Sequence, residues 1–438
     1  MSSAGYESYV NELSDLASQI GTQPWQASEP DVYAVLNGQA AGRVRKLVPA
    51  QFRRETGAYF TSGAIKDRFA ALLDTRESGN RMMFWDAACG AGDLLLAACA
   101  RLPLRSSLSE TLDSWSRLLY GQDLQPEFVR AARLRLFVAA AARHRQRGDT
   151  IRTTPEAGAQ RFSHVQSGDG LEALQATSKF RGHILLNPPF GLVEADRDCT
   201  WSTGATAQAG VFLLAGARAL APGYPLTAIL PDVLRSGSRY QAWRAEAEGL
   251  LDIEHIIPVG RFDRHTDVDV FFLSGRRSRP SASAASRARW WPDLEAAVRL
   301  EEVFDIRVGP VVDNRDPHDG PTVPFLTARG MPVKGTMGEP IQRRAFAGRL
   351  MEPPFVAVRR TSRPGDSSES RARGILVRGA NPIAVDNHVI TLRPRSGAER
   401  ECVEVLEVLA SERTARWLDE RIRCRHLTVG VLRSLPWR

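Results

Sequence analysis

Short apolar runs alternate with helical stretches between residues 64 and 275, and this alternation constrains the fold more than any other feature of the sequence. Six runs have the length and composition of β-strands: 82–85, 118–120, 183–186, 226–230, 253–257 and 268–272. Strands separated by helices predict an α/β fold built on a parallel sheet. A short loop separates the last two runs, so we expect a hairpin to close the sheet.

The flanking regions have a different character. Residues 7–20 carry apolar side chains at helical spacing and predict an amphipathic helix. Residues beyond 290 contain many prolines and glycines, short β-like runs, and a Glu- and Leu-rich stretch at 398–422 that predicts a helix. We therefore expect four parts: an N-terminal helical segment (1–50), a central domain (51–275), a linker (276–289) and a second, smaller α+β domain (290–438).

Composition excludes several classes of protein. Hydrophobic residues make up 43% and charged residues 25% of the 438 residues, which excludes a largely disordered chain. No apolar run approaches ~18 residues, so no membrane helix is expected, and the first residues lack the pattern of a signal peptide. The five cysteines are scattered without a C-x-x-C pair, which indicates neither disulfides nor a metal site and favours a reduced, cytoplasmic protein.

The net charge is +8, and only four of the 58 basic residues are lysines. Arginine binds phosphates and guanine edges, which favours a nucleic-acid partner, but GC-rich codon usage explains the overall arginine content better. A local excess is more informative, since residues 341–379 hold nine arginines against three acidic residues. Arg343, Arg344, Arg359 and Arg360 are therefore candidate DNA contacts, with a solvated surface as the alternative.

The strongest local signal of chemistry is Leu-Leu-Asn-Pro-Pro-Phe-Gly at residues 185–191, directly after a predicted strand. Alone, it also fits an ordinary Pro-Pro turn. About a hundred residues upstream, residues 84–96 combine a strand, a G-x-G turn and an apolar helix start, which lets a ligand approach a helix N-terminus. Asp123 ends the next strand, where it either binds ribose hydroxyls or caps a helix. Residues 167–170, Ser-Gly-Asp-Gly, form a turn when taken singly.

Together with Thr-Gly-Ala-Tyr-Phe-Thr-Ser at residues 56–62, these segments resemble the γ class of N6-adenine DNA methyltransferases, in which the cofactor motif precedes Asn-Pro-Pro-Phe. The resemblance covers about residues 50–275 and implies a Rossmann-like sheet of the kind found in S-adenosylmethionine-dependent methyltransferases. Two departures stand out, since Ser62 and Ala87 each occupy a position where the family usually has proline.

The resemblance implies S-adenosylmethionine as the cofactor. Asp86 and Gly90 are expected at its methionine end, Asp123 at its ribose and Asp169 at its adenine amine. Tyr59 and Thr61 are expected to supply outer contacts. The full expected cofactor set is Tyr59, Thr61, Asp86, Ala88, Gly90, Asp123, Leu124, Asp169, Gly170 and Asn187.

The resemblance also implies the catalytic group. The exocyclic amine of adenine is a poor nucleophile because its lone pair is delocalised into the ring. Hydrogen bonds to the Asn187 side-chain oxygen and the Pro188 carbonyl would localise that lone pair, so Asn187, Pro188 and Phe190 are the expected catalytic residues. The target base must be flipped out of the duplex. Phe190 is expected to stack on it, and Phe262 is either a second aromatic wall or a core or loop residue.

The C-terminal part resembles the target-recognition domains of type I specificity subunits and of monomeric type II γ-class methyltransferases, through residues 324–331, 354–360 and 425–437. We therefore expect a site-specific DNA adenine-N6 methyltransferase that acts on double-stranded DNA. A separate restriction endonuclease or other defence-system subunits are candidate partners. Two alternatives stay open: a methyltransferase acting on RNA or on a protein glutamine, and a non-catalytic DNA specificity subunit with a relic methyltransferase fold.

Overall fold

A computed structural model describes most of the chain, and its contacts divide the chain into two compact units. The described residues are 4–21, 29–58, 60–73, 82–197, 199–263, 266–279, 288–291, 298–362, 371–423 and 426–437. Unit 1 comprises Met1–Arg235 and Tyr240–Arg289, and unit 2 comprises Ser236–Arg239 and Trp290–Arg438. Most of the linker expected at 276–289 lies outside the described residues.

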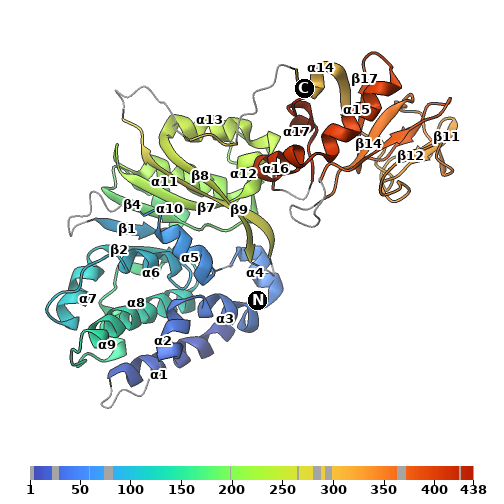
Figure 1. Ribbon diagram of the computed structural model, residues 1–438. Coiled ribbons are helices and arrows are strands. Elements are labelled where there is room, and N and C mark those ends of the chain that lie inside the picture. Colours follow the sequence, from blue (N-terminus) through green and yellow to red (C-terminus); the bar gives the residue numbers. More distant parts are fainter. Residues whose placement is uncertain are drawn as a thin grey trace. The chain divides into compact units, whose positions relative to one another are not determined.

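Unit 1 is built on a seven-stranded sheet with the order β3-β2-β1-β4-β7-β9-β8 (Figure 1). The strands are β1 (Met83–Asp86), β2 (Leu119–Asp123), β3 (Val165–Ser167), β4 (Gly182–Leu186), β7 (Pro225–Pro231), β8 (Leu251–Asp263) and β9 (Thr266–Arg277). Strands β3, β2, β1, β4 and β7 run parallel, and β9 pairs antiparallel with both β7 and β8. All six predicted strands are present, and the predicted hairpin closes the sheet. The sequence reading missed the short strand β3.

Two groups of helices cover the sheet, and Figure 1 shows the sheet between them. One group contains α6 (Asp93–Cys99), α7 (Leu108–Ser116) and α8 (Pro126–Gln146), and the other contains α10 (Gly170–Ala176), α11 (Gln208–Ala219) and α13 (Gln241–Leu250). Apolar side chains surround much of α8, because the N-terminal helix α1 (Glu7–Gly21) covers the side that does not face the sheet. The helix expected at 7–20 is therefore confirmed, and it is part of the core of unit 1.

The remaining N-terminal helices lead the chain to the sheet. They are α2 (Glu29–Leu36), α3 (Gln39–Leu47), α4 (Ala50–Thr56) and α5 (Gly63–Ala70). Tyr6 anchors this region, since its ring makes edge-to-face contacts with Phe60 and Phe128 at centroid distances of 6.0 and 5.0 Å. The N-terminal segment and the sheet therefore share one hydrophobic core. None of the described helices is long and apolar enough to cross a membrane.

Unit 2 is a smaller α+β unit with a five-stranded sheet of order β10-β17-β14-β15-β12 and a three-stranded sheet of order β13-β11-β16. The strands are β10 (Phe304–Val308), β11 (Thr322–Leu326), β12 (Thr336–Met337), β13 (Arg343–Ala345), β14 (Phe355–Arg359), β15 (Gly374–Val377), β16 (Ala384–Val385) and β17 (Val389–Pro394). Helices α14 (Leu300–Val303), α15 (Glu399–Ala410), α16 (Glu412–Arg421) and α17 (Val429–Arg433) complete it.

The prediction of a single helix at 398–422 is wrong, because this stretch forms two helices, α15 and α16. Ser411 lies between them in an extended conformation, and its hydroxyl accepts a hydrogen bond from the backbone N–H of Thr414. This is the geometry of a helix N-cap, which begins a new helix where the apolar pattern alone predicts a continuous one.

Candidate active site

A cleft of about 290 Å³ lies at the carboxyl ends of β1, β2 and β4, where ligands bind in open α/β sheets. Its lining includes most of the expected cofactor residues: Thr61, Asp86, Ala88, Gly90, Asp123, Leu124, Asp169, Gly170 and Asn187. These residues come from five separate parts of the sequence. Tyr59 lies outside the described residues. The lining does not include Pro188, Phe190 or Phe262.

The turn after β1 is tied to the end of β2. The backbone N–H of Gly90 donates to Asp123 Oδ2 at 3.0 Å, and Asp123 Oδ1 accepts from the Gln125 N–H at 2.9 Å. Gly90 has a φ of 50°, and a Cβ there would lie 2.6 Å from the Phe60 ring, so a larger residue is excluded. Burial raises the pKa of Asp123 to about 6, and the two backbone N–H groups limit this rise.

The alternative role that the sequence left open for Asp123, a helix cap, belongs to a different aspartate. Gln125 is the N-cap of α8, whereas Asp169 is the N-cap of α10. Asp169 Oδ1 accepts from the backbone N–H groups of Leu171 at 2.8 Å and Glu172 at 3.2 Å. Asp169 therefore has a structural role as well as a place in the cleft wall.

Asp86 is the most buried carboxyl group of the cleft, with 1% of its surface exposed. Its Oδ1 accepts from the Ala88 N–H at 3.2 Å. Burial raises the pKa of Asp86 to about 8, and the negative charges of Asp123 and Asp93 contribute to the rise. The Ala88 N–H opposes this rise, and a cation bound beside the carboxyl group would stabilise its ionised form further.

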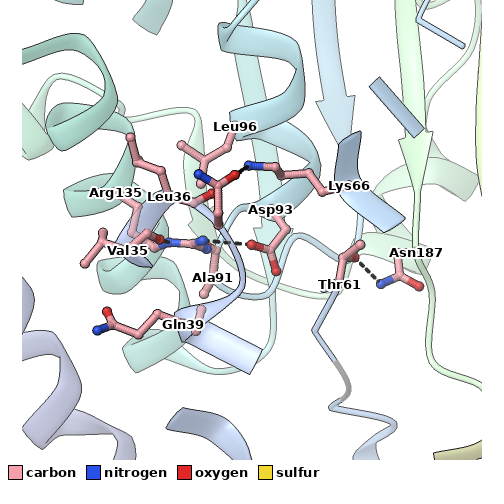
Figure 2. A network of polar contacts seen from close by, with 12 residues as sticks. Val35, Leu36, Gln39, Thr61, Lys66, Ala91, Asp93, Leu96, Arg135 and Asn187 are labelled. Carbon is pink, nitrogen blue, oxygen red and sulfur yellow. Dashed lines mark hydrogen bonds and ion pairs between the residues drawn. The ribbon is translucent and has the colours of Figure 1, made fainter. Parts of the chain in front are cut away.

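Asn187 follows β4, whose five residues are all buried. Its Nδ2 donates to Thr61 Oγ1 at 2.9 Å, and Figure 2 shows the two side chains facing each other. The same two segments meet at Gly57, where a Cβ would lie 2.4 Å from Pro189 Cβ. Gly57 and Thr61 therefore pack directly on the Asn-Pro-Pro-Phe segment, although about 130 residues separate them from it in sequence.

The two aromatic residues expected at the target base contact each other. The rings of Phe190 and Phe262 are 5.3 Å apart between centroids and nearly perpendicular, at 85°. Phe190 is partly buried, whereas Phe262 is 1% exposed and belongs to the hydrophobic core of unit 1. This geometry favours the core alternative for Phe262, with its ring supporting Phe190 from the side.

A polar network that the sequence motifs did not predict lies behind the cleft (Figure 2). Asp93, in the cleft wall, accepts from the fully buried Arg135 of α8 at 2.8 Å. Arg135 also donates to the backbone carbonyls of Val35 at 2.9 Å and Ala91 at 2.6 Å. The network thereby joins α2, α8 and the turn after β1. An arginine within the apolar run of α8 was the available signal for it.

Lys66 of α5 makes a second link to α2. Its ammonium group donates to the Leu36 carbonyl at 2.7 Å and to Asn37 Oδ1 at 2.5 Å, and burial lowers its pKa. Among the described residues, no cluster of His, Cys, Asp or Glu has an arrangement that would hold a metal ion.

The four arginines expected at DNA have different surroundings in unit 2. Arg344 is 3% exposed and forms an ion pair with Asp313, which favours a structural role. Arg359 donates to the backbone carbonyls of Ala328, at 3.0 Å, and Met331, and Arg360 donates to the Asn387 carbonyl at 3.4 Å. The side chain of Arg343 is 52% exposed and lies 3.5 Å from Glu339. Arg343 is therefore the most accessible of the four.

The large, mostly parallel sheet of unit 1 and the smaller α+β unit 2 confirm the predicted fold class, with a sheet like that of S-adenosylmethionine-dependent methyltransferases. The type IIL restriction–modification enzyme MmeI, solved in complex with DNA, resembles this chain with a TM-score of 0.57 and 11% identity over 90% of this chain and 70% of that one. The coverage exceeds the length of unit 1, so the similarity extends into unit 2.

Two further solved structures, both from restriction–modification systems, match this chain with lower scores. The methyltransferase subunit of a type I system from Streptococcus thermophilus matches with a TM-score of 0.35 and 19% identity, over 55% of this chain and 49% of that one. The M protein of the type I enzyme EcoKI matches with a TM-score of 0.34 and 17% identity, over 63% of this chain and 64% of that one. This chain thus spans about half the length of the S. thermophilus subunit. No protein-family model and no curated protein sequence matches it.

Proposed function

We propose that this protein is a DNA methyltransferase that transfers a methyl group from S-adenosylmethionine to N6 of adenine in double-stranded DNA. One observation carries the proposal. Asn187 follows the central strand β4 and reaches the same cleft that Asp86, Asp123 and Asp169 line. The Asn187 side-chain oxygen can accept a hydrogen bond from a neutral amine that receives the methyl group. The three carboxyl groups suit a methyl donor that is cationic and carries hydroxyl groups.

The cleft residues fit S-adenosylmethionine on chemical grounds. Its ribose hydroxyls are hydrogen-bond donors, and Asp123 keeps free acceptor capacity because each of its oxygens accepts one backbone hydrogen bond. Asp86 is a buried carboxyl group whose charged neighbours are acidic, so a cationic ligand would stabilise its ionised form. Leu124 is 63% exposed in the cleft wall and offers an apolar surface for an adenine ring.

The bound cofactor would supply an activated methyl group on a sulfonium centre, so positioning is the main task of the protein. The Asn187 side-chain oxygen and the Pro188 carbonyl are the acceptors that would hold the N6 amine with its lone pair toward that methyl group. Proline at 188 and 189 restricts the backbone and removes two N–H donors, which favours a fixed direction for the Pro188 carbonyl. Phe190 would stack on the flipped adenine.

Unit 2 would read the DNA sequence, with the exposed Arg343 as its leading candidate contact. MmeI was solved in complex with DNA, and the similarity to it extends into unit 2, which supports this division of labour. A separate restriction endonuclease or another defence-system subunit is the expected partner of such a modification enzyme.

The test is methyl transfer from labelled S-adenosylmethionine to duplex DNA by the full chain, with the product identified in nucleoside digests. We expect N6-methyladenine, and long-read sequencing would then locate the site. Asn187→Ala should lower turnover by orders of magnitude while DNA and cofactor binding persist. Label in protein glutamine or RNA would instead support another class of methyltransferase. Sequence-specific DNA binding without any methylation would identify a relic specificity subunit.

A further inference from the structure

The contact between Thr61 and Asn187 has a chemical consequence for the proposed reaction. An amide side chain has one acceptor end and one donor end in a single plane, so a bond to either end restricts the direction of the other. Here the donor end of Asn187 is held by Thr61 Oγ1 at 2.9 Å. The acceptor end is thereby left for a ligand, which is the end that adenine N6 requires.

Thr61 itself is well fixed. It is 1% exposed, and it lies just before α5, whose first turn is joined to the preceding segment by the hydrogen bond from Lys66 N to Ser62 O at 2.9 Å. Lys66 in turn holds α5 to α2 through Leu36 and Asn37. The Thr61 hydroxyl that accepts from Asn187 therefore lies next to a helix start that hydrogen bonds hold in place.

A second contact joins the same two segments. Gly57 has a φ of 65° and lies so close to Pro189 that a Cβ would be 2.4 Å from the proline Cβ. Thr61 therefore contacts Asn187 through a side-chain hydrogen bond, and Gly57 contacts Pro189 through backbone packing. Two contacts at different points restrict both the position and the rotation of the segment.

We propose that Thr61 is a positioning residue of the methyl-transfer site, which orients the Asn187 amide so that its oxygen faces the substrate amine. This inference rests on the proposed function and differs from the outer cofactor contact expected of Thr61 from sequence. The two roles make opposite predictions. A positioning residue affects turnover, whereas a cofactor contact affects the affinity for S-adenosylmethionine.

The decisive variant is Thr61→Val, which keeps the shape of the side chain and removes the acceptor. We expect kcat for DNA methylation to fall by about 10- to 100-fold because the reacting groups are misplaced. The dissociation constant for S-adenosylmethionine, measured by calorimetry, should stay within about twofold. Thr61→Ser keeps the hydroxyl and should restore most of the turnover. The matched control is Thr206→Val, since Thr206 is also fully buried and its hydroxyl has no partner in the described structure.

A measurement without catalysis separates this inference from the proposed function. In the full chain labelled with 15N-asparagine, the Asn187 side-chain amide signal is the one lost in Asn187→Ala. We expect Thr61→Val to shift this signal and to speed exchange of its protons with water, while Thr61→Ser and Thr206→Val leave both nearly unchanged. An unaltered Asn187 signal in Thr61→Val would overturn the inference, as would a loss confined to cofactor affinity. A wild-type chain that never methylates adenine would contradict the proposed function alone, because the amide signal would still report the positioning contact.

Discussion

Replacing Arg135 by methionine tests whether the polar network behind the cleft stabilises unit 1. The substitution keeps an apolar chain of similar length and removes the guanidinium group. Three acceptors lose their donor: Asp93 Oδ1 and the backbone carbonyls of Val35 and Ala91. Arg135 is fully buried and Asp93 is 5% exposed, so water cannot readily replace the lost hydrogen bonds.

Removing one partner of a buried ion pair costs about 3–5 kcal/mol, because the remaining charge stays in a medium of low polarity. For a unit of this size each kcal/mol lowers Tm by roughly 2–4 °C, so the transition of unit 1 should fall by roughly 6–20 °C. Adding Asp93→Asn to Arg135→Met should recover part of the loss, because the uncompensated charge is then absent.

Calorimetry of the full chain measures the shift, and hydrogen exchange of peptides from α8 identifies the transition that belongs to unit 1. Arg130→Met is the matched control on the same helix. Arg130 pairs with Glu7 at 2.5 Å, but the two side chains are 54% and 39% exposed, and such a pair contributes about 0–1 kcal/mol. Equal, small decreases in Tm for the two arginine variants would show that burial does not make the Arg135–Asp93 pair more stabilising than the exposed pair.

Four further predictions concern the cleft and unit 2. The pKa of Asp86 is raised from 3.8 to about 8, so between these pH values the folded chain keeps a proton that the unfolded chain loses. The free energy of unfolding of the wild type should therefore fall as pH rises from about 4 to 8. Calorimetry at a series of pH values should find a smaller slope in Asp86→Asn. A cationic cofactor requires the ionised carboxylate, so its affinity should increase between pH 6 and 8 in the wild type and vary less in Asp86→Asn, as isothermal calorimetry would measure; a flat wild-type profile would contradict this role. Gly57→Ala should lose methyl transfer in the radiolabel assay, because its Cβ would displace Pro189, whereas the open Gly249→Ala should keep it. If Arg343 contacts a phosphate, Arg343→Ala should weaken DNA binding and reduce the slope of log K against log salt concentration by about 0.9. Arg344→Ala should mainly lower the stability of unit 2. Equal salt slopes in the wild type and Arg343→Ala would exclude a phosphate contact of Arg343.

The sheet of unit 1 was largely predictable, because most of its strands are apolar runs whose signal is local. Strand β3 was missed because it has only three residues, of which Val165 alone is buried. The hairpin of β5 (Leu192–Glu194) and β6 (Ala205–Ala207) was also missed, because each strand has only three residues and β5 has no buried one. The break at Ser411 was missed because an apolar pattern does not reveal a local cap.

The cleft residues were predictable as a group because they follow strands of one parallel sheet. The carboxyl ends of parallel strands lie at one edge, so Asp86, Asp123 and Asn187 are brought together by strand order alone. The surroundings of single residues were not predictable in the same way. The count of charged residues within 341–379 left out acidic partners from other parts of the chain, such as Asp313, which pairs with Arg344.

The α/β class, the strands that carry the motifs and most of the residues that line the cleft follow from the sequence alone, since these depend on local patterns and on strand order. Which side chains contact each other depends on the tertiary structure. Asn187 donates to Thr61, 126 residues away in sequence, and Arg135 donates to Asp93, 42 residues away. Phe262 lies in the hydrophobic core. Such contacts depend on the packing of whole elements against one another, so no local pattern in the chain records them.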